Sequence, residues 1–257
     1  MNKQWNKFLL EAIENNEINL PSLEIKNTLN MNIWQSEERI KHEVSSRLIQ
    51  IAMDFLESLD IGQHVIKDIT LTGSLANYNW TEFSDIDLHI LLDFRYIDKN
   101  TELVGYFFNA KKSDWNKMHQ IMIKNHEVEI YIQDINEPHI STGIYSLLED
   151  EWLLKPDQAA PKINYETIKI KAKSIMDQID RVQELYDSNN HEAVQNVSDL
   201  IRGKIKRLRR CGLAEHGIYS TENLVFKTLR NNGYIKKLLD LKNNSYDKMM
   251  SLNHNAV

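Results

Sequence analysis

Residues 71–92 read LTGSLANYNWTEFSDIDLHILL and contain the features that decide the fold. From Asp85 onward, apolar side chains alternate with polar ones, a period of two that indicates a half-buried β-strand. Because alternate residues of a strand face the same way, Asp85 and Asp87 point to one face with their carboxylates close together. The run before them, Val65–Thr72, is rich in β-branched residues and predicts a strand that ends at a Gly-Ser turn.

Outside these two strands, most of the chain has apolar residues at helical spacing. Residues 127–133 are the exception in the first half, since their alternation predicts a third strand. Strands separated by helices, followed after Ile163 by helices alone, predict an α/β (α+β) domain with a mixed sheet flanked by helices and then an all-helical C-terminal domain. The predicted helices span residues 6–18, 36–59 with Ser36 as N-cap, 102–123, 165–186 and 192–210, with a further start at Ser220.

Charge divides the chain into two unlike halves. The 257 residues carry 31 Lys and Arg against 37 Asp and Glu, a net charge of −6. Residues 1–160 hold 14 basic and 26 acidic side chains, and residues 161–257 hold 17 and 11, so the halves carry −12 and +6. Pro156 and Pro161 flank the divide, where a helix does not easily continue. We therefore expect two domains, residues 1–155 and residues 161–257.

The composition excludes several classes of protein. With 42% hydrophobic and 26% charged residues, the chain is typical of globular proteins rather than of disordered or fibrous ones. It has no apolar run of the roughly 18 residues that span a bilayer, and its start lacks the pattern of a signal peptide. A single cysteine, Cys211, forms no internal disulfide and disfavours structural zinc. We expect a cytoplasmic protein without membrane partners.

The two strand aspartates need a physical reason to lie together. Like charges side by side destabilise a sheet unless a cation lies between them, and divalent cations such as Mg²⁺ bind carboxylates together with substrate phosphates. Gly73 lets the backbone approach a phosphate, and Ser74 offers a hydroxyl and an N–H. Glu129 supplies a third acid for a site that holds two metal ions, although Glu127 faces the same way and competes for that role. An isolated Asp-x-Asp pair is more often a solvated face, so the combination carries the prediction.

Three short motifs together resemble the signature of the DNA polymerase β-like nucleotidyltransferase superfamily: Gly73-Ser74, Asp85-x-Asp87 and Val128-Glu129-Ile130. The resemblance implies that Gly73 and Ser74 contact a nucleoside triphosphate such as ATP, and that Asp85 and Asp87 bind two Mg²⁺ or Mn²⁺ ions. It implies that Glu129 binds the catalytic ion and helps to deprotonate an attacking hydroxyl. The expected reaction transfers a nucleoside monophosphate to an acceptor hydroxyl and releases pyrophosphate.

In that superfamily the helical domain usually closes the cleft and adds cationic contacts to the triphosphate. We expect Lys171, Lys204 and Arg207 to serve in this way. The last two belong to a run of six cations within residues 202–210, which repel each other unless solvent or an anion compensates. A weaker resemblance, to uncharacterised nucleotidyltransferase-domain proteins of large tailed phages, names no substrate.

The acceptor stays open at this point. The +6 half favours an RNA 3′ end over a small molecule such as an aminoglycoside or a protein side chain that receives AMP. A hypothesis of another class is a catalytically silent nucleotide-binding module. The presence of all three acids speaks against it, because a module freed from catalysis has no need to hold repelling carboxylates together.

Overall fold

The structure of the chain is a computed structural model that describes residues 18–20, 23–62, 65–138, 141–158 and 161–252. It contains two compact units, the first beginning at Glu24 and the second at Pro161, and the described residues before Glu24 belong with the second unit. The sequence-based domains placed the residues before Glu24 in the first domain, whereas Leu23 lies in the apolar core of the helical unit. Within the described residues, no helix combines the length and the apolar character needed to cross a bilayer.

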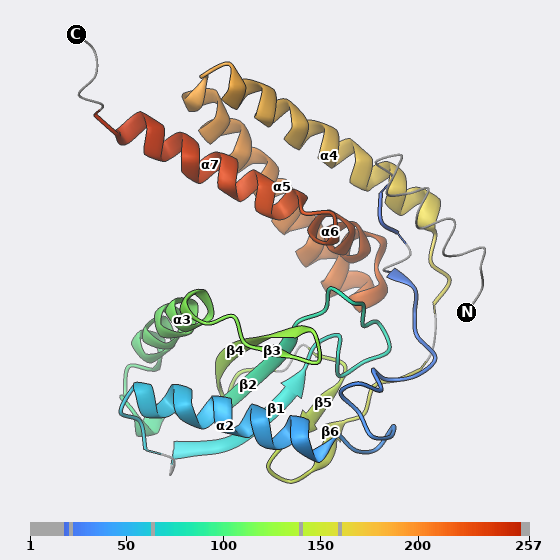
Figure 1. The fold of residues 1–257 in the computed structure, drawn as a ribbon, viewed down its shortest axis with the longest axis vertical. Helices are drawn as coiled ribbons and strands as arrows, with labels where there is room; N and C mark the ends of the chain where they lie inside the picture. The colour runs from blue at the N-terminus through green and yellow to red at the C-terminus, as the bar shows by residue number, and fades with distance from the viewer. Residues whose placement is uncertain (1–17, 21–22, 63–64, 139–140, 159–160, 253–257) are drawn as a thin grey trace. The chain divides into compact units, whose positions relative to one another are not determined.

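The first unit is built on a mixed sheet of six strands in the order β3-β4-β2-β1-β5-β6 (Figure 1). The central strands β1 (Ile66–Thr72) and β2 (Ile86–Leu92) are antiparallel, and β4 (His126–Asp134) runs parallel to β2. Strands β1, β2 and β4 confirm the three strands predicted from the sequence. The outer strands, which periodicity did not reveal, are β3 (Met122–Ile123), β5 (Ile144–Ser146) and β6 (Glu151–Leu154).

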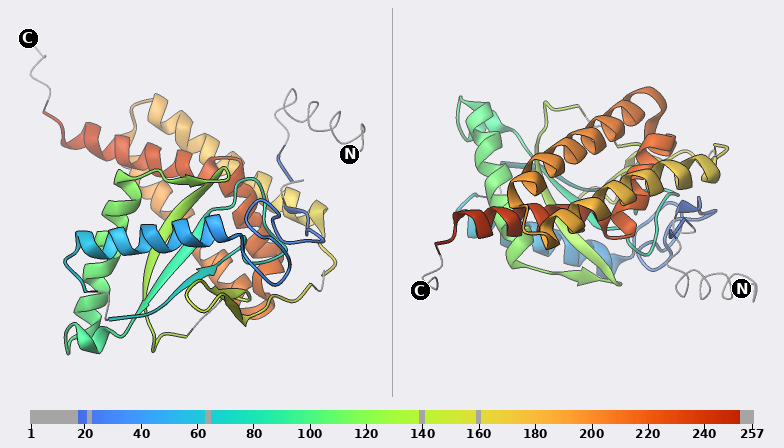
Figure 2. Two further views of the ribbon diagram at one scale, coloured as in Figure 1. Left: turned by 60° about the horizontal axis from the view of Figure 1, so that its bottom comes forward. Right: turned by 90° about the horizontal axis from the view of Figure 1, so that it is seen from above.

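Two helices bury the apolar face of this sheet. Helix α2 (His42–Ser58) crosses that face (Figure 2), and its Leu48 and Phe55 share one core with alternate residues of β2. Helix α3 (Thr101–Met118), which follows the short 3-10 helix η3 (Phe94–Tyr96), adds Phe108 to the same core. The polar residues of β2 alternate with these buried ones and therefore lie on the opposite face.

The start of α2 differs from the sequence-based expectation. Ser36 is not its N-cap, and the helix begins six residues later at His42. The intervening segment turns back on itself, because Trp34 and Ile40 form a β-bridge and the Ser36 hydroxyl accepts the backbone N–H of Glu38 at 3.2 Å. Trp34 is fully buried between aromatic rings of the sheet, so its tertiary packing overrides the local helical pattern.

The second unit is helical, and its four α-helices all contact one another (Figure 1). Their buried residues, such as Ile179, Ile201 and Leu229, form a core of their own. The predicted N-cap Ser220 is confirmed, since its hydroxyl accepts the backbone N–H of Asn223 at 3.2 Å. Residues 6–17 of the expected first helix lie outside the described residues. The helices are α4 (Tyr165–Asp187), α5 (His191–His216), η4 (Gly217–Tyr219), α6 (Thr221–Asn231) and α7 (Tyr234–Met250).

Candidate active site

The strand register brings the predicted site residues to one end of the sheet. Asp87 of β2 lies directly opposite Thr72 of β1 on one side and opposite Glu129 of β4 on the other. Thr72 is the last residue of β1, so the Gly73-Ser74 turn begins beside Asp87. Cross-strand neighbours have their Cβ atoms about 5 Å apart and share a face of the sheet. The fold thus places the turn, Asp87 and Glu129 side by side, with Asp85 directly before β2.

Gly73 makes a close approach that no other residue could make. Its φ of +74° lies in the left-handed region, and a Cβ built on it would lie 1.7 Å from Oδ2 of Asp87. The Gly73 N–H donates to the Ser141 hydroxyl at 3.3 Å. The Gly73 backbone therefore lies directly against the Asp87 carboxylate, with no room for a side chain between them.

Hydrogen bonds of serine hydroxyl groups link the two ends of the connection between β1 and β2. The Ser74 hydroxyl donates to the Ser84 oxygen at 2.8 Å, and the same oxygen accepts the backbone N–H of Thr81 at 2.9 Å. Nδ1 of His126 lies 2.6 Å from the Ser84 carbonyl, while Nε2 lies 2.9 Å from the Asn30 amide nitrogen. Because that amide nitrogen can only donate, Nδ1 carries the proton toward the carbonyl. The starts of β2 and β4 are thereby tied together.

The third acid has a hydroxyl donor of its own. The Tyr131 hydroxyl donates to Oε2 of Glu129 at 2.6 Å. Burial raises the pKa of Tyr131 above its ordinary value, and the charges of Glu129, Asp87 and Asp85 raise it further. The Tyr131 hydroxyl thus experiences the negative charge of all three acids.

Lys112 of α3 brings a positive charge to the same place. Its Nζ lies 4.2 Å from the centroid of the Tyr131 ring, a cation–π distance. Burial lowers the pKa of Lys112, and the charge of Glu129 opposes that shift. A half-buried cation beside the acids offsets part of their mutual repulsion.

Carboxylate oxygens are the donors that Mg²⁺ and Mn²⁺ prefer, so the chemistry of this donor set suits a hard divalent cation. In the described part of the chain, however, no three His, Cys, Asp or Glu side chains are grouped closely enough to hold a metal ion. Asp85 and Asp87 make further polar or electrostatic interactions. The acids are adjacent, and their side chains would have to adjust in order to hold a metal ion together.

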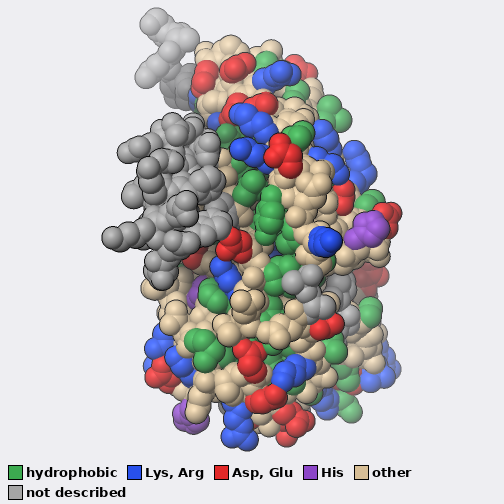
Figure 3. Space-filling model, turned by 90° about the vertical axis from the view of Figure 1, so that its right-hand side faces the viewer, with side chains coloured by type: hydrophobic (Ala, Val, Ile, Leu, Met, Phe, Trp, Pro, Cys, Tyr) green, Lys and Arg blue, Asp and Glu red, His purple; other side chains and the backbone are tan. Residues whose placement is uncertain are grey.

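The three predicted phosphate-binding cations all belong to the helical unit. Nζ of Lys171 forms an ion pair with Oε1 of Glu222 at 2.8 Å, and Lys204 donates to Gln178 at 3.3 Å. Arg207 is exposed on α5, as are the other five cations of residues 202–210. Acidic and basic side chains are also interspersed on the face drawn in Figure 3. The triphosphate contacts of these three residues stay a prediction.

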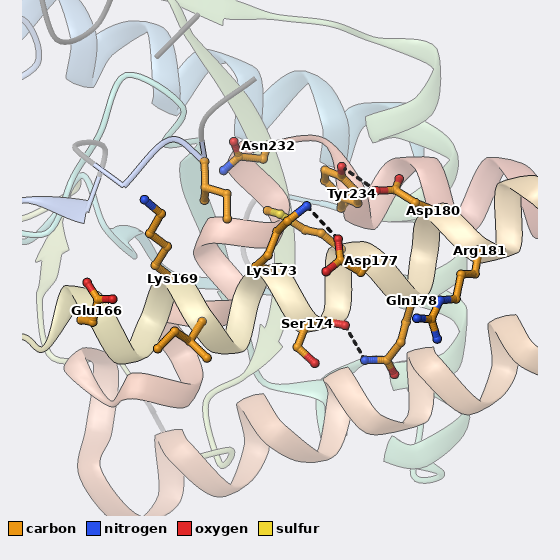
Figure 4. A pocket seen from close by; sticks show the side chains of 13 residues that line it. Glu166, Lys169, Lys173, Ser174, Asp177, Gln178, Asp180, Arg181, Asn232 and Tyr234 are labelled. Atoms are coloured by element: carbon orange, nitrogen blue, oxygen red, sulfur yellow. Dashed lines mark hydrogen bonds and ion pairs between the residues drawn. The ribbon is translucent and has the colours of Figure 1, made fainter. Parts of the chain in front are cut away.

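An open groove of about 970 Å³ runs along α4 of the helical unit (Figure 4). Three of its charged side chains are paired: Lys173 lies 2.7 Å from Asp177, and Asp180 accepts from Lys237 and Tyr234 at 2.8 and 3.2 Å. Because both signs alternate along its wall, the groove lacks the uniform positive charge of a phosphate site.

Sequence reasoning missed the residues that support the acids: Ser84, Lys112, His126, Tyr131 and Ser141. Tyr131 could have been found, because it lies two residues after Glu129 in the same alternating strand and so faces the same way. Lys112 and Ser141 could not, since only the tertiary structure brings their segments to the site.

Comparison with known proteins identifies one family. Residues 50–151 match the family model described as the nucleotidyltransferase domain, which belongs to the polymerase β-like nucleotidyltransferase superfamily. The matched segment contains all the motif residues on which the resemblance rested, so the predicted superfamily and fold class are confirmed. No curated protein and no solved structure matches the chain.

Proposed function

We propose that this chain, which carries a nucleotidyltransferase domain of the polymerase β-like superfamily, transfers a nucleoside monophosphate from a nucleoside triphosphate to an acceptor hydroxyl in a metal-dependent reaction. The domain supports nucleotidyl transfer in general. The observation that carries the proposal is the register of three neighbouring strands, which lines up the Gly73 turn, Asp87 and Glu129.

Asp85, Asp87 and Glu129 are the residues that would hold two Mg²⁺ or Mn²⁺ ions. When bound, such ions neutralise charge on the triphosphate and on the attacking and leaving oxygens. The close contact between Gly73 and Oδ2 of Asp87 supports this assignment, because it fixes one carboxylate against rigid backbone.

The protein residues themselves position the substrates and accept the proton. The acceptor oxygen forms a bond to the α-phosphorus while the bond from that phosphorus to the bridging oxygen breaks, and pyrophosphate leaves with the electron pair. The proton of the acceptor hydroxyl passes toward Glu129. The Gly73-Ser74 turn would bind the triphosphate by exchanging the present partners of the Gly73 N–H and the Ser74 hydroxyl, Ser141 and Ser84, for phosphate oxygens. Lys171, Lys204 and Arg207 are proposed to add positive charge to the triphosphate.

An RNA 3′ end is the acceptor that the charge distribution favours. Residues 161–257 carry a net charge of +6, and the six cations of α5 within residues 202–210 are exposed. Exposed cations on one helix suit phosphates, whose neutralisation dominates binding to nucleic acids. Binding of a labelled single-stranded RNA that weakens steeply between 50 and 200 mM salt supports this acceptor. No binding at the lower concentration counts against it.

The test of the reaction uses each of the four α-labelled triphosphates with Mg²⁺ or Mn²⁺ and a cell lysate as the source of acceptors. Label that enters RNA, protein or small molecules identifies the acceptor class. Asp87→Asn should abolish the transfer while the fold is kept, and unchanged turnover in that variant refutes the mechanism. Glu129→Gln and Glu127→Gln form a matched pair, because only the first should abolish transfer.

A catalytically silent nucleotide-binding module is the second candidate. One observation favours it, namely that no three metal-ligating side chains are yet grouped among the described residues. This candidate predicts nucleotide binding without release of pyrophosphate. The same assay therefore separates the two functions, because binding without label transfer under any of the eight triphosphate and metal combinations supports the module.

A further inference from the structure

Tyr131 lies on the polar face of the sheet within a set of side chains that fix its ring. It is the cross-strand neighbour of His89, and the two rings stack with centroids 5.0 Å apart and planes 23° from parallel. The His89 ring is held in turn, since its Nδ1 lies 3.0 Å from the Gln133 side-chain oxygen. The ring of Tyr131 therefore has little freedom to rotate away from the acids.

The α3 helix fixes the ring from the edge of the sheet. Asn116 pairs with β4 as a strand would, because its amide donates to the Ile130 carbonyl at 3.2 Å and its oxygen accepts the Ile130 N–H at 3.1 Å. Lys112 precedes Asn116 by one helical turn and so lies on the same side of α3. This anchor places Nζ of Lys112 4.2 Å from the centroid of the Tyr131 ring.

The fixed ring directs its hydroxyl at one oxygen of Glu129. The O–H donates to Oε2 at 2.6 Å, the short distance typical of a donor to a charged carboxylate. The bond engages Oε2 of Glu129, so Oε1 is the carboxylate oxygen that the tyrosine does not hold. A phenylalanine at this position would fill the same space but would leave the carboxylate free to rotate.

We propose that Tyr131 is a positioning residue of the transfer reaction, which holds the Glu129 carboxylate so that one oxygen faces the acceptor hydroxyl, with Lys112 steadying the ring. The inference rests on the proposed function. It adds a role for a residue that lies outside the three sequence motifs. A positioning residue acts through the group it holds, so its loss should slow the chemical step without weakening nucleotide binding.

The test compares Tyr131→Phe with Tyr145→Phe in the full chain. Tyr145 is the control, because it too lies on a strand of the sheet and its hydroxyl donates to a carboxylate, Oδ1 of Asp150, at 2.7 Å. Tyr131→Phe should lower kcat by about 10- to 100-fold with the KM for the triphosphate unchanged within about twofold. Tyr145→Phe should leave both constants within about threefold of wild type.

Urea unfolding supplies a readout that does not depend on activity. A double-mutant cycle of Tyr131→Phe with Glu129→Ala should show coupling of about tenfold or more in the unfolding equilibrium constant, as expected for a hydrogen bond to a charged group. The inference is overturned if an active enzyme shows no coupling, if Tyr131→Phe keeps kcat within threefold of wild type, or if Tyr145→Phe loses as much. A wild-type protein that transfers no label refutes the proposed function, and the positioning role of Tyr131 fails with it whatever the double-mutant cycle shows.

Discussion

Gly73→Ala is the substitution that tests the active-site geometry most directly. The new Cβ would lie 1.7 Å from Oδ2 of Asp87, whereas an ordinary contact between carbon and oxygen is about 3.3 Å. The carboxylate or the turn must therefore move by about 1.6 Å. Because a misplacement of about 1 Å can cost about 100-fold in rate, we expect transfer to fall by at least about 100-fold.

The effect on stability should be small by comparison. At a φ of +74°, alanine costs roughly 1–2 kcal/mol relative to glycine. Gly233→Ala isolates this backbone cost, since Gly233 is left-handed with a φ of +77° and has nothing within 4 Å of the added Cβ. Both variants should lose a similar amount of unfolding free energy in urea.

The assay measures initial rates of label transfer beside urea midpoints for wild type and both variants. Only Gly73→Ala should be defective in transfer. If it transfers within threefold of the wild-type rate, the close contact with Asp87 has no part in the chemistry and the reasoning is refuted. Equal losses of transfer in both variants would instead assign the defect to backbone strain.

Three further substitutions test the energetics of the fold. Burial raises the pKa of Asp68 above its ordinary 3.8, so its proton binds more tightly in the folded state. Stability should therefore fall as the pH rises from 3.8 through the raised pKa of the folded protein. Above that raised pKa the urea midpoint of Asp68→Asn should exceed the wild-type midpoint, and the difference should vanish near pH 2. Gly212→Ala brings a Cβ within 2.6 Å of Cβ of Glu222, and this overpacking should lower the unfolding free energy by about 1–3 kcal/mol in urea; an unchanged midpoint would contradict the close packing of α5 on α6. Asp87→Asn removes one of two facing acids and should raise the unfolding free energy by about 0.5 kcal/mol in metal-free buffer while transfer is lost; a lower midpoint would show that the pair does not repel.

Strong periodicity was sufficient to predict the centre of the fold. β2 and β4 were visible because one face of each is buried, which forces apolar and polar residues to alternate. β5 and β6 were not visible, since they have only three and four residues and show no alternation of burial. The start of α2 was wrong because the fit of Trp34 into the core, which depends on residues far along the chain, outweighs a local pattern.

The site could be predicted from the sequence only where its residues share a strand or a turn. Asp85 and Asp87 share a face by the geometry of a strand, but the placement of Glu129 beside Asp87 depends on the pairing of β2 with β4. The family resemblance supplied that pairing before the structure did. Residues that reach the site from α3 or from the segment after β4 have no such relation in sequence, so Lys112 and Ser141 were found only in three dimensions.

The structure also explains how a sheet can tolerate these acids before any substrate binds. Asp87 and Glu129 face each other across a parallel strand pair, an arrangement that destabilises the sheet through like charge. The chain offsets part of this cost with the Tyr131 hydroxyl on Glu129 and the half-buried Lys112 charge. Both compensating groups act from the β4 side, whereas Asp87 rests against the glycine turn. A divalent cation and a triphosphate would relieve the repulsion between the two carboxylates that remains.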